Sequence, residues 1–183
     1  MAGVGSAFHI RLAGTGDARS LAVLGAQLFG QSFGAANTPE DMRAYISSAF
    51  AEGRQRADLE DPSIRIWLAE SSSGEAIGYA QIRFGAVPPA SAAILSEQPA
   101  ELVRLYADRA WHGRGVGAAL LRTCIGACSD SGADVLWLGV WQENPRAIAF
   151  YEKHEFRRRG KQSFLLGADR QTDWVMARTL RPR

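Results

Sequence analysis

The sequence predicts a single α/β domain with a mixed, mostly antiparallel central sheet of about seven strands and about four helices. The chain has 183 residues, 46% hydrophobic and 22% charged, which suits one folded core rather than a disordered or membrane-embedded chain. Strand-like and helix-like segments alternate without an internal repeat, a low-complexity tract or a linker. We therefore treat residues 1–183 as one domain.

The charges of the chain nearly balance. Its 21 Lys and Arg residues against 19 Asp and Glu leave a net charge of +2, too little to predict electrostatic binding to nucleic acid or to an anionic membrane. The segment Met1–His9 lacks the features of a secretory signal, and no stretch reaches the ~20 apolar residues that cross a bilayer. We expect a cytoplasmic protein without nucleic-acid or membrane partners. The sequence leaves open whether two copies form a homodimer.

One strand and two helices are expected in the first third of the chain. Residues 10–12 form a short strand that ends at residues 14–16, and Asp17 can cap the next helix. The apolar residues of that helix repeat at helical spacing: Leu21, Leu24 and Leu28. A second helix is expected over residues 38–51, because Thr38 precedes a proline and two acids, the usual signals of a helix start.

Three strands follow. Residues 64–70 and 77–84 read as strands joined by the turn Ser71–Gly74. Residues 87–99 are rich in Pro and Ala and are expected to form a loop. Residues 101–107 alternate between apolar and polar side chains, which predicts a strand with one buried face.

A helix over residues 115–131 and a strand over residues 135–140 come next. Cys124 and Cys128 lie one turn apart on the apolar face of that helix. We interpret them as small buried hydrophobes, since no further Cys or His lies nearby to complete a metal site, and we expect no metal. The strand is almost continuously apolar, which predicts that both of its faces are covered.

The chain is expected to close with one helix and two strands. Asn144-Pro145 is a typical helix start, with Asn as the cap, and predicts a short helix to about His154. Residues 156–166 and 172–180 read as strands. The basic cluster at residues 157–161 is expected to guard a solvated sheet edge.

The glycine-rich segment Trp111–Ala118, between a strand and a helix, is the most informative. Three glycines in the five residues 113–117 let backbone N–H groups point together in front of a helix N-terminus, which suits a pyrophosphate. A plain turn is the alternative. A Walker loop is excluded because no lysine follows the glycines. A Rossmann fingerprint fits formally, but residues 108–111 separate the loop from its strand and only 65 residues follow Ala118.

Three segments resemble the GNAT acetyltransferases in their order and spacing. They are the strand Glu101–Ala107, the loop His112-x-x-Gly115-x-Gly117 and the helix Asn144–Tyr151. Residues 38–45, 137–144 and 163–173 are further similar to the PaiA-type spermine/spermidine acetyltransferases of bacteria.

The resemblance implies that acetyl-CoA is a co-substrate. Its pantetheine is expected to pair like an extra strand with backbone groups, and its pyrophosphate to lie on the glycine loop. The expected cofactor-binding residues are Leu105, Tyr106, Ala107, His112, Gly113, Arg114, Gly115, Val116, Gly117, Asn144 and Ala147.

Acetylation of an amine needs a proton acceptor and a proton donor. An alkyl amine with a pKa of about 10.4 is only about 0.04% neutral at pH 7, so a base must help remove its proton. Glu101, on the strand that the resemblance places beside the acetyl group, is the first candidate base, and Glu143 is the second. Tyr151 is the candidate general acid for the leaving thiolate. The alternatives are a solvated glutamate and a packed tyrosine.

The sequence departs from the family pattern at two positions. His112 stands where the family has Arg or Gln and is mostly neutral at pH 7, so the loop is expected to hold pyrophosphate less firmly. Glu155 stands where the family has Gly before a phenylalanine. A left-handed Glu costs on the order of 1 kcal/mol, so we expect the helix to end differently. Contact of residues 157–161 with the 3′-phosphate of CoA is a further alternative for that basic cluster.

The acceptor is the least determined part of the prediction. The resemblance favours spermidine or spermine, and another small-molecule amine, a peptide N-terminus, a lysine or an amino-bearing antibiotic is the alternative. Glu40 and Asp41 either lie within reach of a polyamine or merely stabilise their own helix. An acyl-CoA-binding sensor without catalytic activity is the alternative from another class of function.

Overall fold

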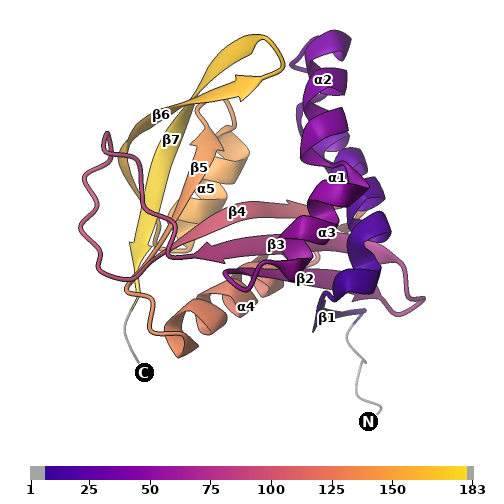
Figure 1. Cartoon of the computed structure of the whole chain (residues 1–183), viewed down its shortest axis with the longest axis horizontal. Coiled ribbons are helices and arrows are strands. Elements are labelled where there is room, and N and C mark those ends of the chain that lie inside the picture. Colours follow the sequence, from indigo (N-terminus) through magenta and orange to yellow (C-terminus); the bar gives the residue numbers. More distant parts are fainter. Residues whose placement is uncertain (1–6, 181–183) are drawn as a thin grey trace.

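The computed structural model describes residues 7–180, and in this range the chain forms one seven-stranded sheet with five α-helices (Figure 1). The strands are β1 (Phe8–Leu12), β2 (Ile64–Ser71), β3 (Ala76–Phe84), β4 (Pro99–Ala107), β5 (Val135–Trp141), β6 (Arg157–Leu166) and β7 (Asp169–Thr179). The helices are α1 (Ala18–Phe33), α2 (Pro39–Ala49), α3 (Glu52–Glu60), α4 (Val116–Asp130) and α5 (Pro145–Lys153). Short 3₁₀ turns at Thr15–Asp17 and Arg109–Trp111 precede α1 and α4.

The sheet has the order β1-β2-β3-β4-β5-β7-β6. Every neighbouring pair is antiparallel except β4 and β5, which are parallel. The mixed, mostly antiparallel sheet that the sequence predicts is therefore confirmed. β6 is an edge strand, as expected for the basic cluster that begins it.

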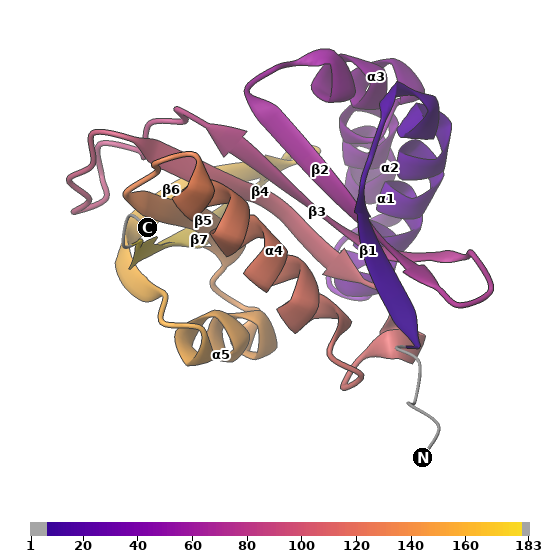
Figure 2. The same ribbon diagram turned by 90° about the horizontal axis from the view of Figure 1, so that it is seen from below.

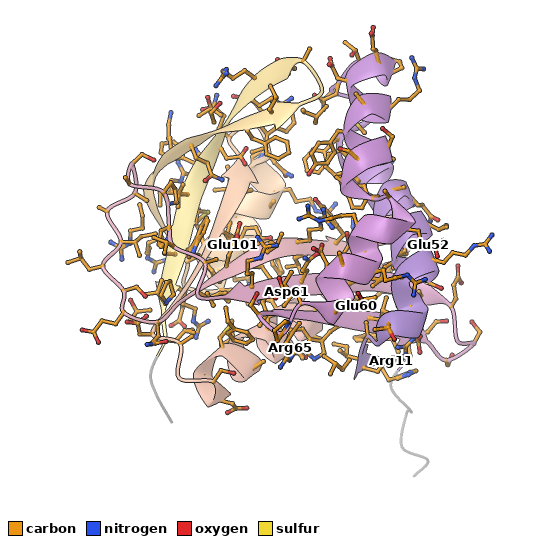
Figure 3. The ribbon with its side chains drawn as sticks, in the orientation of Figure 1. Arg11, Glu52, Glu60, Asp61, Arg65 and Glu101 are labelled. Atoms are coloured by element: carbon orange, nitrogen blue, oxygen red, sulfur yellow. The ribbon has the colours of Figure 1, made fainter. Side chains whose placement is uncertain are left out.

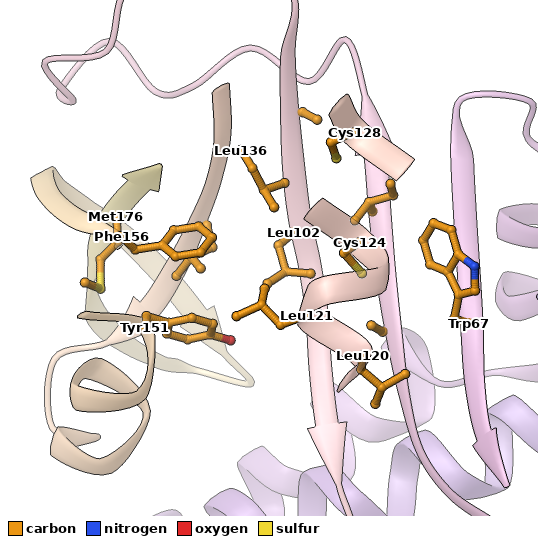
Figure 4. Packing of buried hydrophobic residues seen from close by; sticks show 14 of the residues in the cluster. Trp67, Leu102, Leu120, Leu121, Cys124, Cys128, Leu136, Tyr151, Phe156 and Met176 are labelled. Atoms are coloured by element: carbon orange, nitrogen blue, oxygen red, sulfur yellow. The ribbon is translucent and has the colours of Figure 1, made fainter. Parts of the chain in front are cut away.

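The helices cover the two faces of the sheet separately. Figure 2 shows α4 and α5 on one face and α1, α2 and α3 on the other. The core under α4 includes Leu102 of β4 together with Leu121, Cys124 and Cys128 (Figure 4). Both cysteines are fully buried, which confirms their interpretation as core residues. A second core lies between α1, α2, β2 and β3.

Two helix starts follow from their capping residues. The Thr38 side chain accepts a hydrogen bond of 3.2 Å from the backbone N–H of Asp41 at the start of α2. The Asn144 side chain accepts one of 3.0 Å from the backbone N–H of Ala147 at the start of α5. A proline occupies the next position in both helices, where its missing N–H has no cost.

The helix α3 is absent from the sequence prediction, which has four helices where the structure has five within residues 7–180. Its buried residues are polar: Gln55 donates to the Ala49 carbonyl at 2.9 Å, and Asp58 accepts from Arg54 at 3.1 Å. A helix that buries hydrogen-bonded polar groups shows no apolar stripe, so periodicity does not reveal it.

The expectation that α5 would end without a left-handed residue is wrong. Glu155 has φ = 68°, the only positive φ outside glycine among the described residues. Its carboxylate forms an ion pair of 2.7 Å with Arg178, and Arg178 also donates to the His154 carbonyl at 2.9 Å. These contacts offset the strain and fix the turn that leads into β6.

No helix within residues 7–180 is long and apolar enough to cross a membrane. The expectation that the segment Met1–His9 is not a secretory signal concerns residues 1–6, which lie outside the described part of the chain.

Candidate functional site

The strands β4 and β5 separate soon after they meet. They pair only over Pro99–Glu101 and Val135–Trp137, and beyond these three pairs they diverge (Figure 1). A bulge marks the same point, because Gln81 and Ile82 of β3 face Arg104 and Leu102 and leave Val103 without a partner. The edge of β4 that faces β5 is therefore open beyond Glu101, where an extended ligand can pair with its backbone.

The exposure of the two strands agrees with this opening. Leu105, Tyr106 and Ala107 are half-buried although β4 is a central strand. Gly139, two residues beyond the last β4–β5 pair, is exposed. The rest of Val135–Val140 is buried, which confirms that β5 is covered on both faces, and Gly139 is the exception. A Cβ on Gly139 would collide with Gln162 Nε2 and lie 3.2 Å from Asp173 Oδ2, so these side chains border it. We call the surface formed by Gly139, Trp141, Gln162 and Asp173 the Gly139 opening.

The predicted phosphate loop lies between β4 and α4. Gly113 and Gly115 have φ of 77° and 86°, a left-handed conformation that permits this turn and that other residues adopt with strain. The loop residues His112, Gly113, Arg114 and Gly115 are exposed. Behind them the first-turn N–H groups of α4, from Val116 and Gly117, have no partner within the helix. The loop and the helix N-terminus can therefore hold a pyrophosphate.

The His112 ring is directed back at the end of β4. Its Nε2 lies 3.0 Å from the carbonyl oxygen of Ala107. The ring thus ties the phosphate loop to the strand whose edge is open.

Asp108, which the sequence analysis did not single out, fixes the loop to α1. Its carboxylate accepts from Gln31 at 2.9 Å, from Gln27 at 3.2 Å and from the backbone N–H of Ala110 at 2.8 Å. The backbone N–H of Arg109 donates to the Gln31 side chain at 3.1 Å. A single Asp after a strand gives no distinctive signal, because its side-chain partners Gln27 and Gln31 lie some 80 residues away in the sequence.

Tyr151 lies on the α4–α5 face of the open region. Its side chain is 9% exposed, and Figure 4 shows its hydroxyl directed from α5 toward Leu121 of α4. Burial raises the pKa of Tyr151 well above its usual range, and the nearby Cys124 acts in the same direction. The hydroxyl therefore stays protonated and can donate a proton. A Cβ on Gly117 would lie 3.8 Å from the Phe150 ring, so the α5 turn that includes Ala147 packs near the start of α4.

The two candidate bases differ in their surroundings. Glu101 lies on β4 (Figure 3), where it pairs in register with Arg83 of β3 and with Trp137 of β5. Burial raises the pKa of Glu101, and the Arg83 charge opposes this rise. Glu143 is exposed in the turn between β5 and α5. Of the two, Glu101 lies closer to the point where β4 and β5 separate.

Asp173 is a buried acid that the sequence analysis missed. It lies on β7, pairs in register with Trp141 and Gln162, and is 7% exposed. Burial raises the pKa of Asp173 to about 6, and a hydrogen bond from the Gln162 side chain opposes the rise. Alternation along β7 is the signal that could have found it, because it places Asp173 on the same face as the buried Val175 and Ala177.

Two other charged groups have structural contacts. Asp41 accepts from Thr38 Oγ at 2.7 Å and from the Ala168 backbone N–H at 2.7 Å, which joins the start of α2 to the β6–β7 turn.

Arg157, Arg159 and Arg178 line a cavity of about 670 Å³ beside the C-terminal half of α4. The phosphate loop lies at the other end of this 15-residue helix, about 22 Å long. For Arg157 and Arg159 the geometry therefore favours the sheet-edge interpretation over contact with a CoA phosphate.

Several known proteins are similar to this chain in sequence or in fold. Residues 27–156 match the family model described as "Acetyltransferase (GNAT) family". An uncharacterized N-acetyltransferase of Mycobacterium tuberculosis is 34% identical over 164 residues, covering 90% of this chain and 98% of that protein. Streptothricin acetyltransferase of Streptomyces lavendulae is 24% identical over 174 residues, covering 88% of this chain and 87% of that protein.

A solved structure extends the similarity to the fold. The PaiA N-acetyltransferase of Thermoplasma acidophilum, in complex with coenzyme A, superimposes with a TM-score of 0.73 at 17% identity, covering 94% of this chain and 98% of that one. At this identity the likeness concerns the fold and leaves the PaiA-type subfamily a prediction. The family match covers most of the chain, and the chain belongs to the GNAT family of acetyl-CoA-dependent N-acetyltransferases.

Proposed function

We propose that this N-acetyltransferase acts on a primary alkyl amine, with spermidine or spermine as the first acceptor class to test. The separation of β4 and β5 carries the proposal. It creates an open strand edge for the pantetheine of acetyl-CoA, with Tyr151 on one face of the sheet and the Gly139 opening on the other. The thioester and the amine can then approach each other from opposite faces.

The cofactor is proposed to bind along β4 and the start of α4. Backbone groups of Leu105, Tyr106 and Ala107 pair with the pantetheine, since strand pairing depends on the backbone rather than on side-chain identity. The loop from His112 to Gly117, which also includes Gly113, Arg114, Gly115 and Val116, holds the pyrophosphate through backbone N–H groups. Asn144 and Ala147, at the start of α5, complete the site beside Tyr151.

Tyr151 is proposed to donate a proton to the departing sulfur. Its burial keeps the hydroxyl un-ionised, and its position on α5 places it on the opposite face from the Gly139 opening. A carboxylate on the other face receives the amine proton, and Glu101 is the one that the sequence indicates. A polyamine fits this face because two acids, Glu101 and Asp173, lie on it.

Thiol release from acetyl-CoA with a panel of amines tests the proposal. The panel contains spermidine, spermine, a monoamine of similar length, a peptide N-terminus and streptothricin. If charge sets recognition, the polyamines have a much lower KM than the monoamine, and the difference shrinks as ionic strength rises. KM values that are equal for the polyamines and the monoamine, and independent of salt, would exclude polyamines as the specific acceptors. They would leave the proposal of an amine acetyltransferase intact. CoA binding without thiol release by any amine would favour the acyl-CoA sensor.

An amino-bearing antibiotic is the second acceptor candidate. The similarity to streptothricin acetyltransferase over most of both chains favours it. A streptothricin kcat/KM at least tenfold above that of spermidine would select this alternative.

A further inference from the structure

Asp173 is a buried carboxylate without a cationic partner in the described structure. It is 7% exposed, and none of the ion pairs found within residues 7–180 includes it. The other buried acid in this range, Asp58, contrasts with it: Arg54 pairs with Asp58 at 3.1 Å, and Gln81 donates to its second oxygen at 3.1 Å. Buried charges in proteins are normally paired, so a cation from outside the chain would stabilise the ionised Asp173 carboxylate.

The Asp173 carboxylate borders the one exposed residue of β5. A Cβ on Gly139 would lie 3.2 Å from Asp173 Oδ2, and any side chain there would collide with Gln162 Nε2. Gly139 lies two residues beyond the last β4–β5 pair, where the open edge of β4 begins. The Gln162 amide lies over Gly139, so a ligand that enters at the Gly139 opening displaces this amide and then meets both the carboxylate and the point where the strands separate.

Polar and charged groups on β6, α2 and β4 lie near Asp173 or near its neighbours. Gln162 of β6 donates a hydrogen bond to the carboxyl, and Tyr45 of α2 lies within electrostatic reach of both Asp173 and Arg104. Arg104 is engaged elsewhere: it donates to Gln81 at 3.3 Å and to the Ala49 carbonyl at 3.1 Å. Its charge therefore belongs to the polar network under α3.

Lys161, the basic residue next to Gln162 on β6, points away from this carboxylate. Lys161 Nζ is 4.3 Å from the centre of the Trp174 ring, and Trp174 packs on the α4–α5 core. Since side chains alternate along a strand, Lys161 and Trp174 lie on the opposite face from Gln162 and Asp173.

We propose that Asp173 binds the ammonium group of the acceptor at the Gly139 opening and receives its proton. This inference rests on the proposed function. One ammonium proton passes to the carboxylate, and the nitrogen lone pair then forms the C–N bond at the thioester carbonyl. The C–S bond breaks with its electron pair on sulfur, which gains a proton as the nitrogen loses a second one. Asp173 returns its proton to solvent.

Asp173 suits this role better than Glu101 does. Glu101 faces the Arg83 guanidinium in register, so a cation already lies beside it. Glu101 also belongs to the last pair of the closed part of the sheet, opposite Trp137. Asp173 instead borders the exposed Gly139, and among the described residues no Arg or Lys charge opposes the rise of its pKa.

The test compares three variants of the full chain. Asp173→Asn keeps the shape and removes the charge, Glu101→Gln removes the competing charge, and Asp169→Asn removes an exposed charge from the same strand. Amine kcat/KM and the KM for acetyl-CoA are measured from pH 5 to 9. We expect Asp173→Asn to lose about 10²-fold in amine kcat/KM, the lower end for general-base catalysis, with the acetyl-CoA KM within twofold. Glu101→Gln loses less, and Asp169→Asn matches the wild type.

The pH profile separates a direct role from a structural one. Wild-type kcat/KM falls below about pH 6 as Asp173 becomes protonated, and Asp173→Asn lacks this fall. A variant within threefold of the wild type that keeps the fall would overturn the inference and leave the proposed function standing. If the wild type acetylates no amine, the proposed function fails, and calorimetry of propylammonium with the CoA-loaded protein then decides the inference. Binding that requires Asp173 supports it, and absent or Asp173-independent binding overturns it.

Discussion

The substitution Asp173→Asn is expected to stabilise the fold at neutral pH while it impairs acetyl transfer. Asp173 is buried, the Gln162 amide is the one hydrogen-bonding partner of its carboxyl within residues 7–180, and its pKa rises from 3.8 to about 6 on folding. Each pKa unit corresponds to about 1.4 kcal/mol, so a rise of about two units destabilises the ionised folded state by at most about 3 kcal/mol. Solvent at the Gly139 opening screens part of this, and we expect about 1–2 kcal/mol.

The sign and the pH window follow from proton linkage. An acid with a higher pKa in the folded state binds more protons there than in the unfolded state, so its contribution to stability decreases as pH rises. The wild type therefore loses stability relative to Asp173→Asn between about pH 4 and pH 6, and the difference is constant above that window. Carboxylates with lowered pKa values, such as Asp17 and Glu70, titrate in both proteins and cancel in the difference.

Urea unfolding of both proteins at intervals from pH 4 to pH 8 measures this difference. The expected result is equal stability near pH 4 and a more stable variant at pH 7, by about 1–2 kcal/mol. A difference that does not change with pH, or a variant less stable than the wild type at pH 7, would show that the Asp173 carboxylate is not destabilised by its burial. Asp169→Asn is the control, because that residue is exposed on the same strand.

Three further predictions concern the cofactor and the thiolate. Tyr151→Phe removes only the hydroxyl, so turnover falls about 10²-fold while CoA affinity is unchanged, and an unchanged rate would exclude Tyr151 as the general acid. Asp108→Ala removes the hydrogen bonds from Gln27 and Gln31 that tie the phosphate loop to α1 and raises the CoA Kd severalfold by calorimetry, whereas an equal Kd would show that the remaining Arg109–Gln31 contact holds the loop. His112→Arg adds a permanent charge and tightens CoA binding at pH 5.5 and pH 8 alike; no change would mean that backbone groups bind the pyrophosphate unaided.

The local signals in the sequence account for most of the elements. Thr38-Pro39 and Asn144-Pro145 are helix starts in the structure, since caps depend on neighbouring residues alone. Alternation and apolar runs identify all seven strands of the described chain. The helix α3 escapes because Gln55 and Asp58, rather than apolar residues, face the interior.

The parts of the site that depend on distant segments are harder to predict. The separation of β4 and β5 depends on how many residues of the two strands pair with each other. These strands are connected through α4, and no single segment of the sequence encodes the length of their pairing. The role proposed for Asp173 depends on its position beside Gly139, 34 residues earlier in the sequence, and on the shape of the sheet around it. Glu155 shows the same limit: it adopts a left-handed conformation in a turn, and its ion-pair partner Arg178 lies on β7.

A crystal structure of the protein with CoA and a primary amine tests the central claim most directly. The account predicts that the pantetheine pairs with β4 beyond Glu101, that the sulfur lies between β4 and Gly139 with Tyr151 beside it, and that the amine nitrogen contacts Asp173. A pantetheine bound away from the open edge of β4, or a sulfur remote from both Gly139 and Tyr151, would contradict it.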